Sequence, residues 1–570
     1  MANFGERFLF FSTSPRNPFL IKKYIEIIGE NKLEGRIYDS SLQADFYQFL
    51  SKAKVAGQEA GGAKDPTFAG RDKLTRSPQA LGFLITQNNK PFEVTRAGKL
   101  LENDALFEDV LLHQLLKFQL PSKLHQEKES NRGFFCIKPF LELLRLVDTL
   151  GYLTYQELQI FGMTLTDYRK FEDVVGKIGK FREDREIVRG TISLSKFAED
   201  KQIEVFSELY ADIISSKKFK TRESKTETEE KFTKKKLRNL SDYTDSIFRA
   251  LRATGLIVFT KGRSISISKE RQNEVDYILK HIKRDIEPID MSRAVFDDYI
   301  SNPELPKLLN DNIEIISKEI SQQGIEVSDD SDIYELKSIL NEIRKQKRQL
   351  IFNRQIVELK KKSSEDIADI IEMYQDISNK EVPKSMRSTL FEWNTWRAMT
   401  MINHGHIVGN FIVDDSGMPI STASGGQGDI VGYYGDFNIV IEVTLSTGSR
   451  QYEMEGEPVT RHVGELQKMS DNTTFGLFIA DKLNDTVINH FYVTTNTVSK
   501  VYNGKVVVIP ISTSQFIDFF KKASQIELEA EKLLTINSFS KERAKLALMK
   551  EETEEEWHKD VLEYIMSIAD

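Results

Sequence analysis

The sequence predicts a multidomain protein with a mainly helical N-terminal half, a helical linker and a C-terminal α/β domain built on a central mixed sheet. Three observations lead to this fold class. A chain of 570 residues exceeds what one hydrophobic core usually supports. Two regions of the N-terminal half combine helical spacing with short strands, and strands alternate with helices near the C-terminus. We place the boundaries at residues 1–140, 141–287, 288–382 and 383–570.

The composition is that of an ordinary globular protein, with 40% hydrophobic and 29% charged residues. The single cysteine, Cys136, excludes an intramolecular disulfide and a cysteine-rich zinc site, and it fits a reducing compartment. No stretch approaches the ~18 apolar residues of a membrane span, so we expect a cytoplasmic protein without a membrane partner. A net charge of −8 argues against non-specific coating of nucleic acid but allows binding through one basic face.

Two regions of the N-terminal half have the pattern of a winged helix. In the first, strand-like runs at 81–85 and 92–94 enclose a polar turn and lead into a helix. In the second, a helix ends at Gly255, and strands at 256–259 and 264–267 follow. Two short strands joined by a turn beside helices are typical of the wing of this DNA-binding fold. Small α+β subdomains that only pack together are the alternative.

Basic residues concentrate between about residues 217 and 238, within a chain that is acidic overall. Lys234, Lys235 and Lys236 are our candidates in this stretch for contacts with DNA phosphates. A solvated surface explains such a run equally well. Further along, residues 288–382 are highly charged with helical spacing, and Asp332 and Glu335 form a capping-box pattern, which predicts the helical linker.

The C-terminal region has the pattern of an α/β domain. A helix carries Leu390, Trp393, Trp396 and Met399 on its apolar positions. Strands are expected at 437–443, 475–480 and 506–511, the last two separated by a helix. This alternation predicts a mixed sheet covered on its faces.

The most informative motif of the chain is a pair of acids on neighbouring strands. Asp429 begins one strand, a turn follows, and the next strand climbs through apolar residues to Glu442. A hairpin would place the two carboxylates side by side, where they could hold Mg²⁺ with the Val443 carbonyl as a third ligand. Thr444 shares a face with Glu442 because strand side chains alternate. This is the PD-(D/E)xK layout of nucleases, with Thr444 in the usual lysine position.

Further acids and a histidine lie close to this pair in the sequence. Glu455 could bind a second metal or orient a water, and His462 could move a proton near neutral pH. A surface helix histidine is the alternative for His462. Glu392, on the helix that begins the domain, could instead only favour the helix dipole.

These motifs resemble the AlwI-like family of type IIS restriction endonucleases, which includes nicking endonucleases. The resemblance rests on Glu442-Val443-Thr444, on the segment from Glu455 to His462, and on Phe391-Glu392-Trp393. It continues N-terminally in residues 12–16, 71–72, 95–99, 117–122 and 299–306. It implies Mg²⁺, a short asymmetric target, cleavage to one side of that target, and a threonine in place of the lysine. It also implies catalytic roles at five positions: Glu392, Asp429, Glu442, Glu455 and His462.

Our hypothesis is that the N-terminal half binds one site on double-stranded DNA and that the C-terminal domain cuts outside it. The residues proposed to read or position the DNA are Arg16, Arg71, Asp72 and Lys73. Cutting both strands would need a second copy or a separate cleavage subunit. Two alternatives stay open: a structure-specific or transposase-type nuclease, and a winged-helix regulator with an inactive nuclease-like domain.

Overall fold

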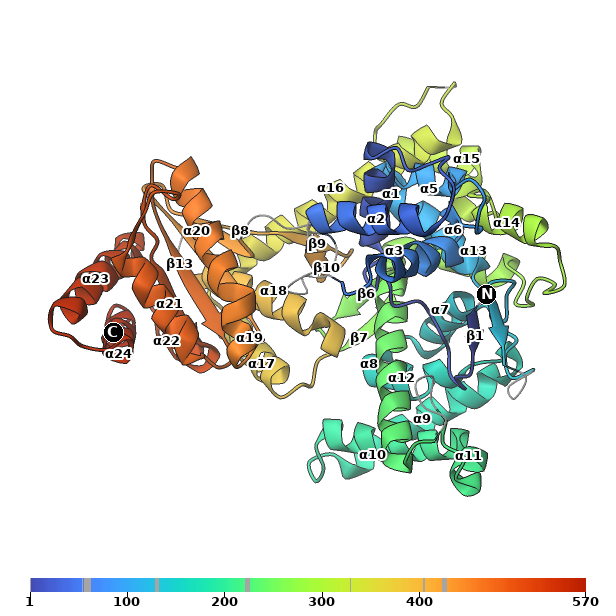
Figure 1. Ribbon diagram of the computed structural model, residues 1–570, viewed down its shortest axis with the longest axis horizontal. Coiled ribbons are helices and arrows are strands. Elements are labelled where there is room, and N and C mark those ends of the chain that lie inside the picture. Colours follow the sequence, from blue (N-terminus) through green and yellow to red (C-terminus); the bar gives the residue numbers. More distant parts are fainter. Residues whose placement is uncertain are drawn as a thin grey trace. The chain divides into compact units, whose positions relative to one another are not determined.

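The computed structural model describes residues 2–53, 55, 63–128, 133–220, 226–328, 330–402, 405–422 and 428–570. The chain forms two compact units, which we describe separately (Figure 1). Unit 1 comprises Met1–Arg348 and Asp414–Met418, and unit 2 comprises Gln349–Val413 and Pro419–Asp570. The predicted combination of a mainly helical multidomain chain and a C-terminal mixed sheet is confirmed. Part of the basic stretch, residues 221–225, lies outside the described residues.

The first part of unit 1 orders its elements as helix, bridge, two helices and a hairpin. The elements are α1 (Phe19–Glu30), α2 (Ser40–Lys52), α3 (Pro66–Thr75), β2 (Leu84–Ile85) and β3 (Glu93–Val94). The two strands pair antiparallel, and Ile37 bridges to Pro91. The hairpin lies where the sequence predicted it, but its first strand is shorter than expected. The short helix α4 (Ser77–Ala80) ends just before this segment, and Gly82 turns the chain with φ +72° before the strand begins.

The second part of unit 1 has the same order with a helical insertion. Its elements are α7 (Pro139–Leu150), β5 (Leu153–Thr154), α8 (Tyr155–Ile160), α12 (Glu229–Arg252), β6 (Ile257–Thr260) and β7 (Ser264–Ile267). The strands form an antiparallel sheet in the order β5-β7-β6. Three helices are inserted between α8 and α12: α9 (Phe171–Val188), α10 (Leu194–Leu209) and α11 (Ala211–Ser216). The predicted pair of strands after Gly255 is thus present.

The other elements of unit 1 complete its helical body. They are β1 (Ala2–Phe4), β4 (His125–Glu127), α5 (Arg96–Leu100), α6 (Phe107–Lys117), α13 (Gln272–His281), α14 (Arg293–Ser301) and α15 (Ile313–Ser321). The long helix α16 (Ile333–Leu359) contains the boundary between the units. Its start is fixed by the predicted capping box, because Asp332 accepts from the Glu335 N–H (2.9 Å) and Glu335 accepts from the Asp332 N–H (3.2 Å).

A buried ion pair binds residues 414–418 into unit 1. The carboxylate of Asp414 accepts hydrogen bonds from the Phe259 N–H (2.8 Å) and from Arg252 Nη2 (3.3 Å). Both charged side chains are only 1% exposed. The flanking strands β9 (Phe411–Val413) and β10 (Pro419–Thr422) pair with each other and belong to unit 2. Removing either charge would therefore strand the other one in the interior.

Unit 2 is built on a five-stranded mixed sheet in the order β16-β13-β12-β11-β8. The strands are β8 (His406–Gly409), β11 (Ile430–Tyr433), β12 (Phe437–Thr444), β13 (Thr473–Ala480) and β16 (Val508–Ser512). β12, β13 and β16 run parallel, whereas β11 and β8 are antiparallel to their neighbours. The helix between the last two strands, α21 (Asp485–Asn496), provides the expected crossover.

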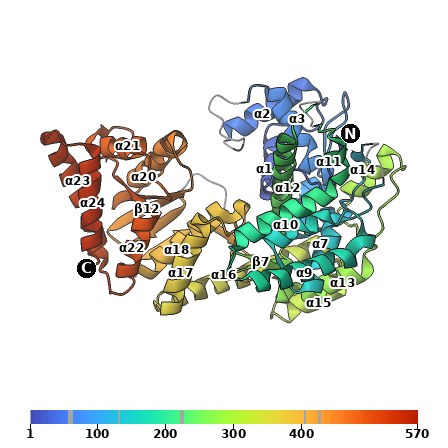
Figure 2. The same cartoon turned by 90° about the horizontal axis from the view of Figure 1, so that it is seen from below.

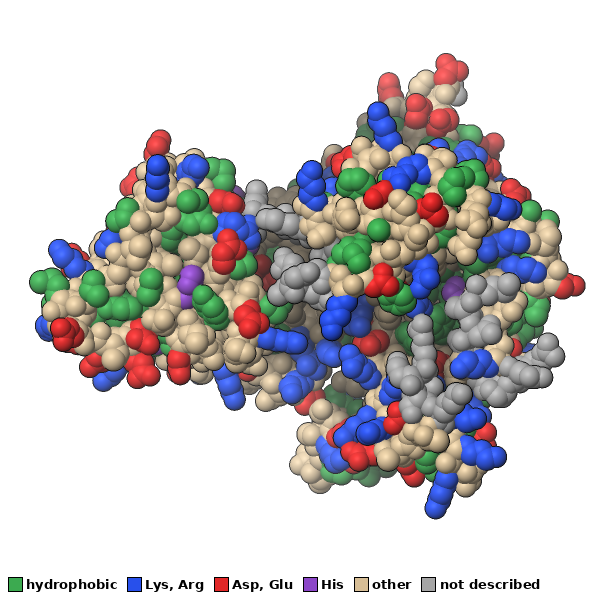
Figure 3. All heavy atoms as spheres, in the orientation of Figure 1, with side chains coloured by type: hydrophobic (Ala, Val, Ile, Leu, Met, Phe, Trp, Pro, Cys, Tyr) green, Lys and Arg blue, Asp and Glu red, His purple; other side chains and the backbone are tan. Residues whose placement is uncertain are grey.

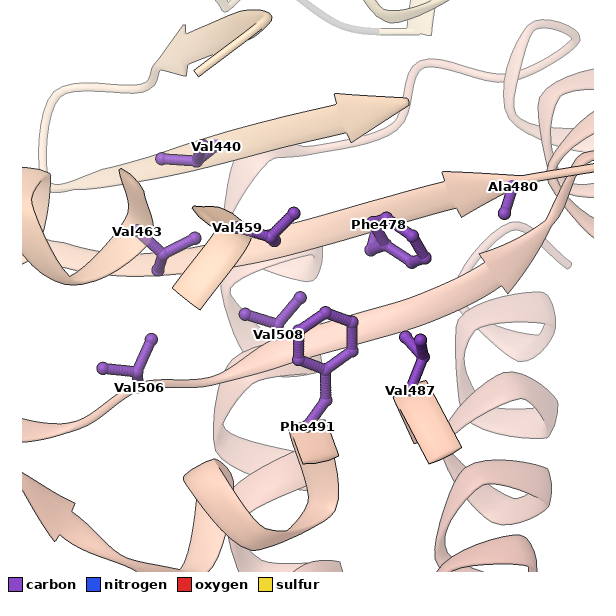
Figure 4. Close-up of a cluster of buried hydrophobic side chains, with 9 residues drawn as sticks. All are labelled: Val440, Val459, Val463, Phe478, Ala480, Val487, Phe491, Val506 and Val508. Carbon is purple, nitrogen blue, oxygen red and sulfur yellow. The ribbon is translucent and has the colours of Figure 1, made fainter. Parts of the chain in front are cut away.

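Helices cover both faces of this sheet (Figure 1). One face packs against α18 (Arg387–Ile402) and α22 (Thr513–Ala523), which in turn contact α17 (Ser364–Ser378), and the other face packs against α20 (Glu457–Met469) and α21. On the second face, Val440, Phe478 and Val508 of the strands meet Val463 of α20 and Phe491 of α21 (Figure 4). At the end of the chain, α23 (Ala530–Met549) and α24 (Glu554–Ser567) pack side by side (Figure 2). None of the helices described is long and apolar enough to cross a membrane.

Candidate active site

The hairpin of β11 and β12 brings the two predicted acids together. Ile430 pairs with Ile441, so Asp429, immediately before β11, falls opposite Glu442. The Val443 N–H donates to Asp429 Oδ2 at 3.0 Å, which fixes the orientation of that carboxylate. The Glu442 side chain is 8% exposed. One local turn therefore brings together two acids, Asp429 and Glu442, that lie 13 residues apart in the sequence.

The two carboxylates stand in an environment that disfavours their charge. Burial and the charge of Glu442 raise the pKa of Asp429 well above its usual range. Burial, together with the charges of Glu455 and Glu392, raises the pKa of Glu442 to about 8. A divalent cation would relieve this repulsion, and carboxylate oxygens are the ligands that Mg²⁺ prefers. The donor set therefore fits Mg²⁺, although no cluster of three or more potential ligands is preassembled within the described residues.

Glu455 and Thr444 form a pair beside these acids. Glu455 lies on a π-helical turn, η8 (Tyr452–Gly456), that leads directly into α20. Thr444 Oγ1 donates to Glu455 Oε1 at 2.7 Å and accepts from the Ser446 N–H at 3.1 Å. π-Helical turns are often found at functional sites. Thr444, at the position where the predicted PD-(D/E)xK pattern usually has lysine, thus orients the carboxylate of Glu455.

His462, on α20, contacts the carboxylate of Glu442. Its Nδ1 atom lies 2.7 Å from Glu442 Oε1, and the side chain is 15% exposed. Burial lowers the pKa of His462, and the neighbouring Arg461 lowers it further. A histidine in this position can orient the carboxylate and exchange a proton with a neighbouring group.

Glu392, on α18, is the fourth carboxylate of the cluster. Burial raises the pKa of Glu392 well above its usual range, and the charges of Asp429 and Glu455 add to this effect. Four carboxylates and one histidine, taken from three helical elements and a hairpin, therefore lie within electrostatic reach of one another. The structure brings together every acid and the histidine that the sequence singled out in this region.

A second candidate site is a cleft in unit 1 with a volume of about 1290 Å³. Among the described residues, nine Lys and Arg side chains and three carboxylates line it, although the chain as a whole has 87 Asp and Glu for 79 Lys and Arg. The cleft therefore suits an anionic ligand. Lys and Arg side chains gather around this hollow over α3 and α12 in Figure 3.

The cleft includes some of the predicted DNA-binding residues and not others. Its lining contains Arg71, Asp72, Lys235 and Lys236, whereas Arg16, Lys73 and Lys234 are not part of it. Lys236 forms an ion pair with Glu6, Lys234 pairs with Glu230 at 2.6 Å, and Arg16 pairs with Asp242 at 3.0 Å. Sequence reasoning missed other basic residues of the lining, such as Arg7, Arg76 and Arg293, because only the tertiary structure brings them to the cleft.

An acid cluster on a mixed sheet in one unit and a basic cleft in the other are together the arrangement of a nuclease. The family described as AlwI restriction endonuclease matches residues 79–519 of the sequence. The chain belongs to this family, and it is a site-specific deoxyribonuclease.

Two solved structures are similar to parts of the chain. One is the small subunit of the heterodimeric restriction endonuclease R.BspD6I, with 29% identity over 34% of this chain and 97% of that chain, and a TM-score of 0.28. The other is the BpuJ1 endonuclease binding domain, solved in complex with pyrene- and phenanthrene-modified DNA. It has 13% identity over 50% of this chain and 92% of that chain, and a TM-score of 0.33. No relative is found among curated proteins.

Proposed function

We propose that this restriction endonuclease is of type IIS. It binds a short asymmetric site on double-stranded DNA through unit 1 and uses Mg²⁺ in unit 2 to hydrolyse a phosphodiester a few base pairs to one side. The observation that supports this most is the pair of facing carboxylates, Asp429 and Glu442, in a site where burial and neighbouring carboxylates raise the pKa of both. Such a site is costly unless it serves a cation.

Each residue of the cluster has a distinct proposed role. Asp429 and Glu442 hold Mg²⁺ with the Val443 carbonyl, and the bound ion supplies Lewis-acid polarisation of the phosphoryl oxygen and a more acidic water. The Val443 N–H orients Asp429. His462 holds Glu442 in place and accepts or returns a proton during hydrolysis.

The two acids at the periphery have proposed roles as well. Thr444 fixes the Glu455 carboxylate, which is placed to orient a water near the metal ligands. Glu392 adds negative charge that favours cation binding.

We further propose that both parts of unit 1 are winged helices. In the first, α1, the Ile37 bridge, α2, α3 and the β2–β3 hairpin follow the order of that fold. In the second, β5 pairs with β7, and the β6–β7 hairpin supplies the wing. By this assignment α3 and α12 are the helices that face the DNA, and both line the basic cleft.

The separation of the two sites into different units explains cleavage outside the target. Unit 1 contains the cleft and unit 2 the acid cluster, so the cut falls where the connection between the units allows the acids to reach. With one acid cluster in the described part of each chain, cutting both strands needs a second copy or a separate cleavage subunit.

A plasmid digestion tests the proposal directly. The full chain is incubated with one plasmid of known sequence in Mg²⁺ or in EDTA, and cut ends are mapped by sequencing. We expect discrete ends at a constant offset from one asymmetric sequence in Mg²⁺ and intact plasmid in EDTA. The Asp429→Ala variant, purified identically, controls for contaminating nucleases. Cutting determined by DNA structure, or cutting that persists in EDTA, would contradict the proposal.

A further inference from the structure

Two helices, α3 and α12, each present one face to the basic cleft of unit 1. From α3 the lining includes Phe68, Arg71, Asp72 and Thr75, which follow the spacing of one helical face. From α12 it includes Phe232, Lys235, Lys236, Asn239 and Tyr243, again on one face. These two helices therefore form two walls of the cleft, and other helices, strands and loops complete its lining.

Four of the nine Lys and Arg side chains described in the lining pair with carboxylates of the protein. Arg76 donates to Asp72 at 2.7 Å, Arg7 to Asp212 at 2.7 Å, and Arg293 to Asp297 at 2.7 Å. Lys236 is bound to Glu6. These pairs neutralise charge and shape the walls, and they include three of the four arginines of the lining.

Arg71 is the exception among the arginines. Its side chain makes no ion pair with any described residue, and its guanidinium lies 5.2 Å from the centre of the Phe68 ring. Phe68 is itself 46% exposed, so the ring supports the guanidinium without burying it. Arg71 therefore presents its five N–H donors to the cleft from a supported position.

The helix that carries Arg71 is held rigidly from behind. Gly70, on the opposite face, approaches α2 so closely that an added Cβ would lie 1.8 Å from the Gln43 carbonyl oxygen. Leu74, one turn later, is fully buried. The Asp65 side chain caps the start of the helix, with Pro66 in its first turn. A 10-residue helix fixed in this way can enter a major groove with its outer face forward.

We infer that α3 reads the target sequence and that Arg71 recognises a guanine, through paired hydrogen bonds to its O6 and N7 atoms. Planar arginine donors match these two acceptors, whereas a phosphate contact would carry no base preference. The exposed lysines Lys218 and Lys220, which also line the cleft, contact phosphates. This inference rests on the proposed binding of DNA by unit 1.

The test measures binding of the full chain, in EDTA, to a set of duplexes. Each duplex carries one base-pair change in the recognised sequence, and the set covers every such change. Arg71→Ala should weaken binding to the intact site by about 5- to 150-fold and remove the penalty for changing one G·C pair. Lys218→Ala should weaken binding to all duplexes alike. Arg71→Lys, which keeps the charge but loses the planar donors, should not restore the G·C preference.

A matched control and two distinct failures complete the design. Arg189, 79% exposed and outside the cleft, provides a control substitution to Ala of the same charge change. If the wild type discriminates among the duplexes and Arg71→Ala keeps all of its preferences, Arg71 does not read a base although the proposed function survives. If the wild type binds every duplex equally, the proposed site-specific binding fails, and the role of Arg71 fails with it.

Discussion

The division of labour between Thr444 and His462 can be separated by two substitutions. Thr444→Val keeps the shape of the side chain but removes the hydroxyl that donates to Glu455 at 2.7 Å. A hydrogen bond to a charged group contributes about 1.5–3 kcal/mol to stability. Because this bond exists before reaction, most of the loss falls on folding, and we expect the cleavage rate to drop by about tenfold or less.

His462→Ala should be far more damaging. It removes the group that lies 2.7 Å from Glu442 Oε1, and a positioned acid or base contributes roughly 10²- to 10⁴-fold. His462→Gln tests whether orientation alone is enough, since glutamine can still donate to Glu442 but cannot exchange a proton. We expect it to cleave nearly as slowly as the alanine variant.

Single-turnover cleavage of a saturated specific duplex is the appropriate measurement, because it isolates chemistry from binding and product release. His406, an exposed histidine on β8 of the same sheet, provides the matched control, and His406→Ala should cut at the wild-type rate. The reasoning is refuted if Thr444→Val is the more damaging change while His462→Ala cuts normally. Recovery of the rate by His462→Gln would reduce His462 to an orienting residue.

Three further predictions concern the metal, salt and stability. Asp429→Asn should abolish cleavage but keep site binding in EDTA. Mg²⁺ should raise the unfolding temperature of the wild type and not that of this variant, and equal increases in unfolding temperature would place the metal elsewhere. Lys235→Ala removes a cation of the cleft lining and should lower the slope of log binding constant against log salt by about one. Lys234→Ala removes a cation outside the lining and should leave the slope unchanged, and identical slopes for the two variants would exclude Lys235 from phosphate contact. Asp414→Ala leaves Arg252 charged and buried and should cost about 3–5 kcal/mol in urea unfolding, and a loss below about 1 kcal/mol would contradict the pair's role.

Local patterns predicted the acid cluster well, for a physical reason. Asp429 and Glu442 are joined by one tight hairpin, so strand periodicity and a turn suffice to place them opposite each other. The same holds for the capping box of Asp332 and Glu335 and for the paired strands β6 and β7. In each case the interacting groups are a few residues apart, and the backbone geometry itself fixes their distance.

The cleft could not be predicted in this way. Its lining comes from separate helices, strands and loops between residues 5 and 293, and only tertiary packing brings them together. Lys236 illustrates the difficulty: within a basic run it suggested a phosphate contact, yet its partner Glu6 lies 230 positions away in the sequence. A charge run indicates only where cations are frequent. Which of them remain available depends on partners that the sequence does not place.

The different charges of the two sites explain how such an enzyme would limit cleavage to DNA near a bound site. The acid cluster of unit 2 consists of four carboxyl groups and one histidine, so without a cation it offers little attraction for phosphates. The basic cleft of unit 1 instead has the charge that suits an anion such as DNA. Under the proposed function, unit 1 raises the local concentration of phosphodiesters near the acids only beside a bound site. Substitutions in the cleft should therefore change where DNA is cut, and substitutions in the cluster should change only whether it is cut.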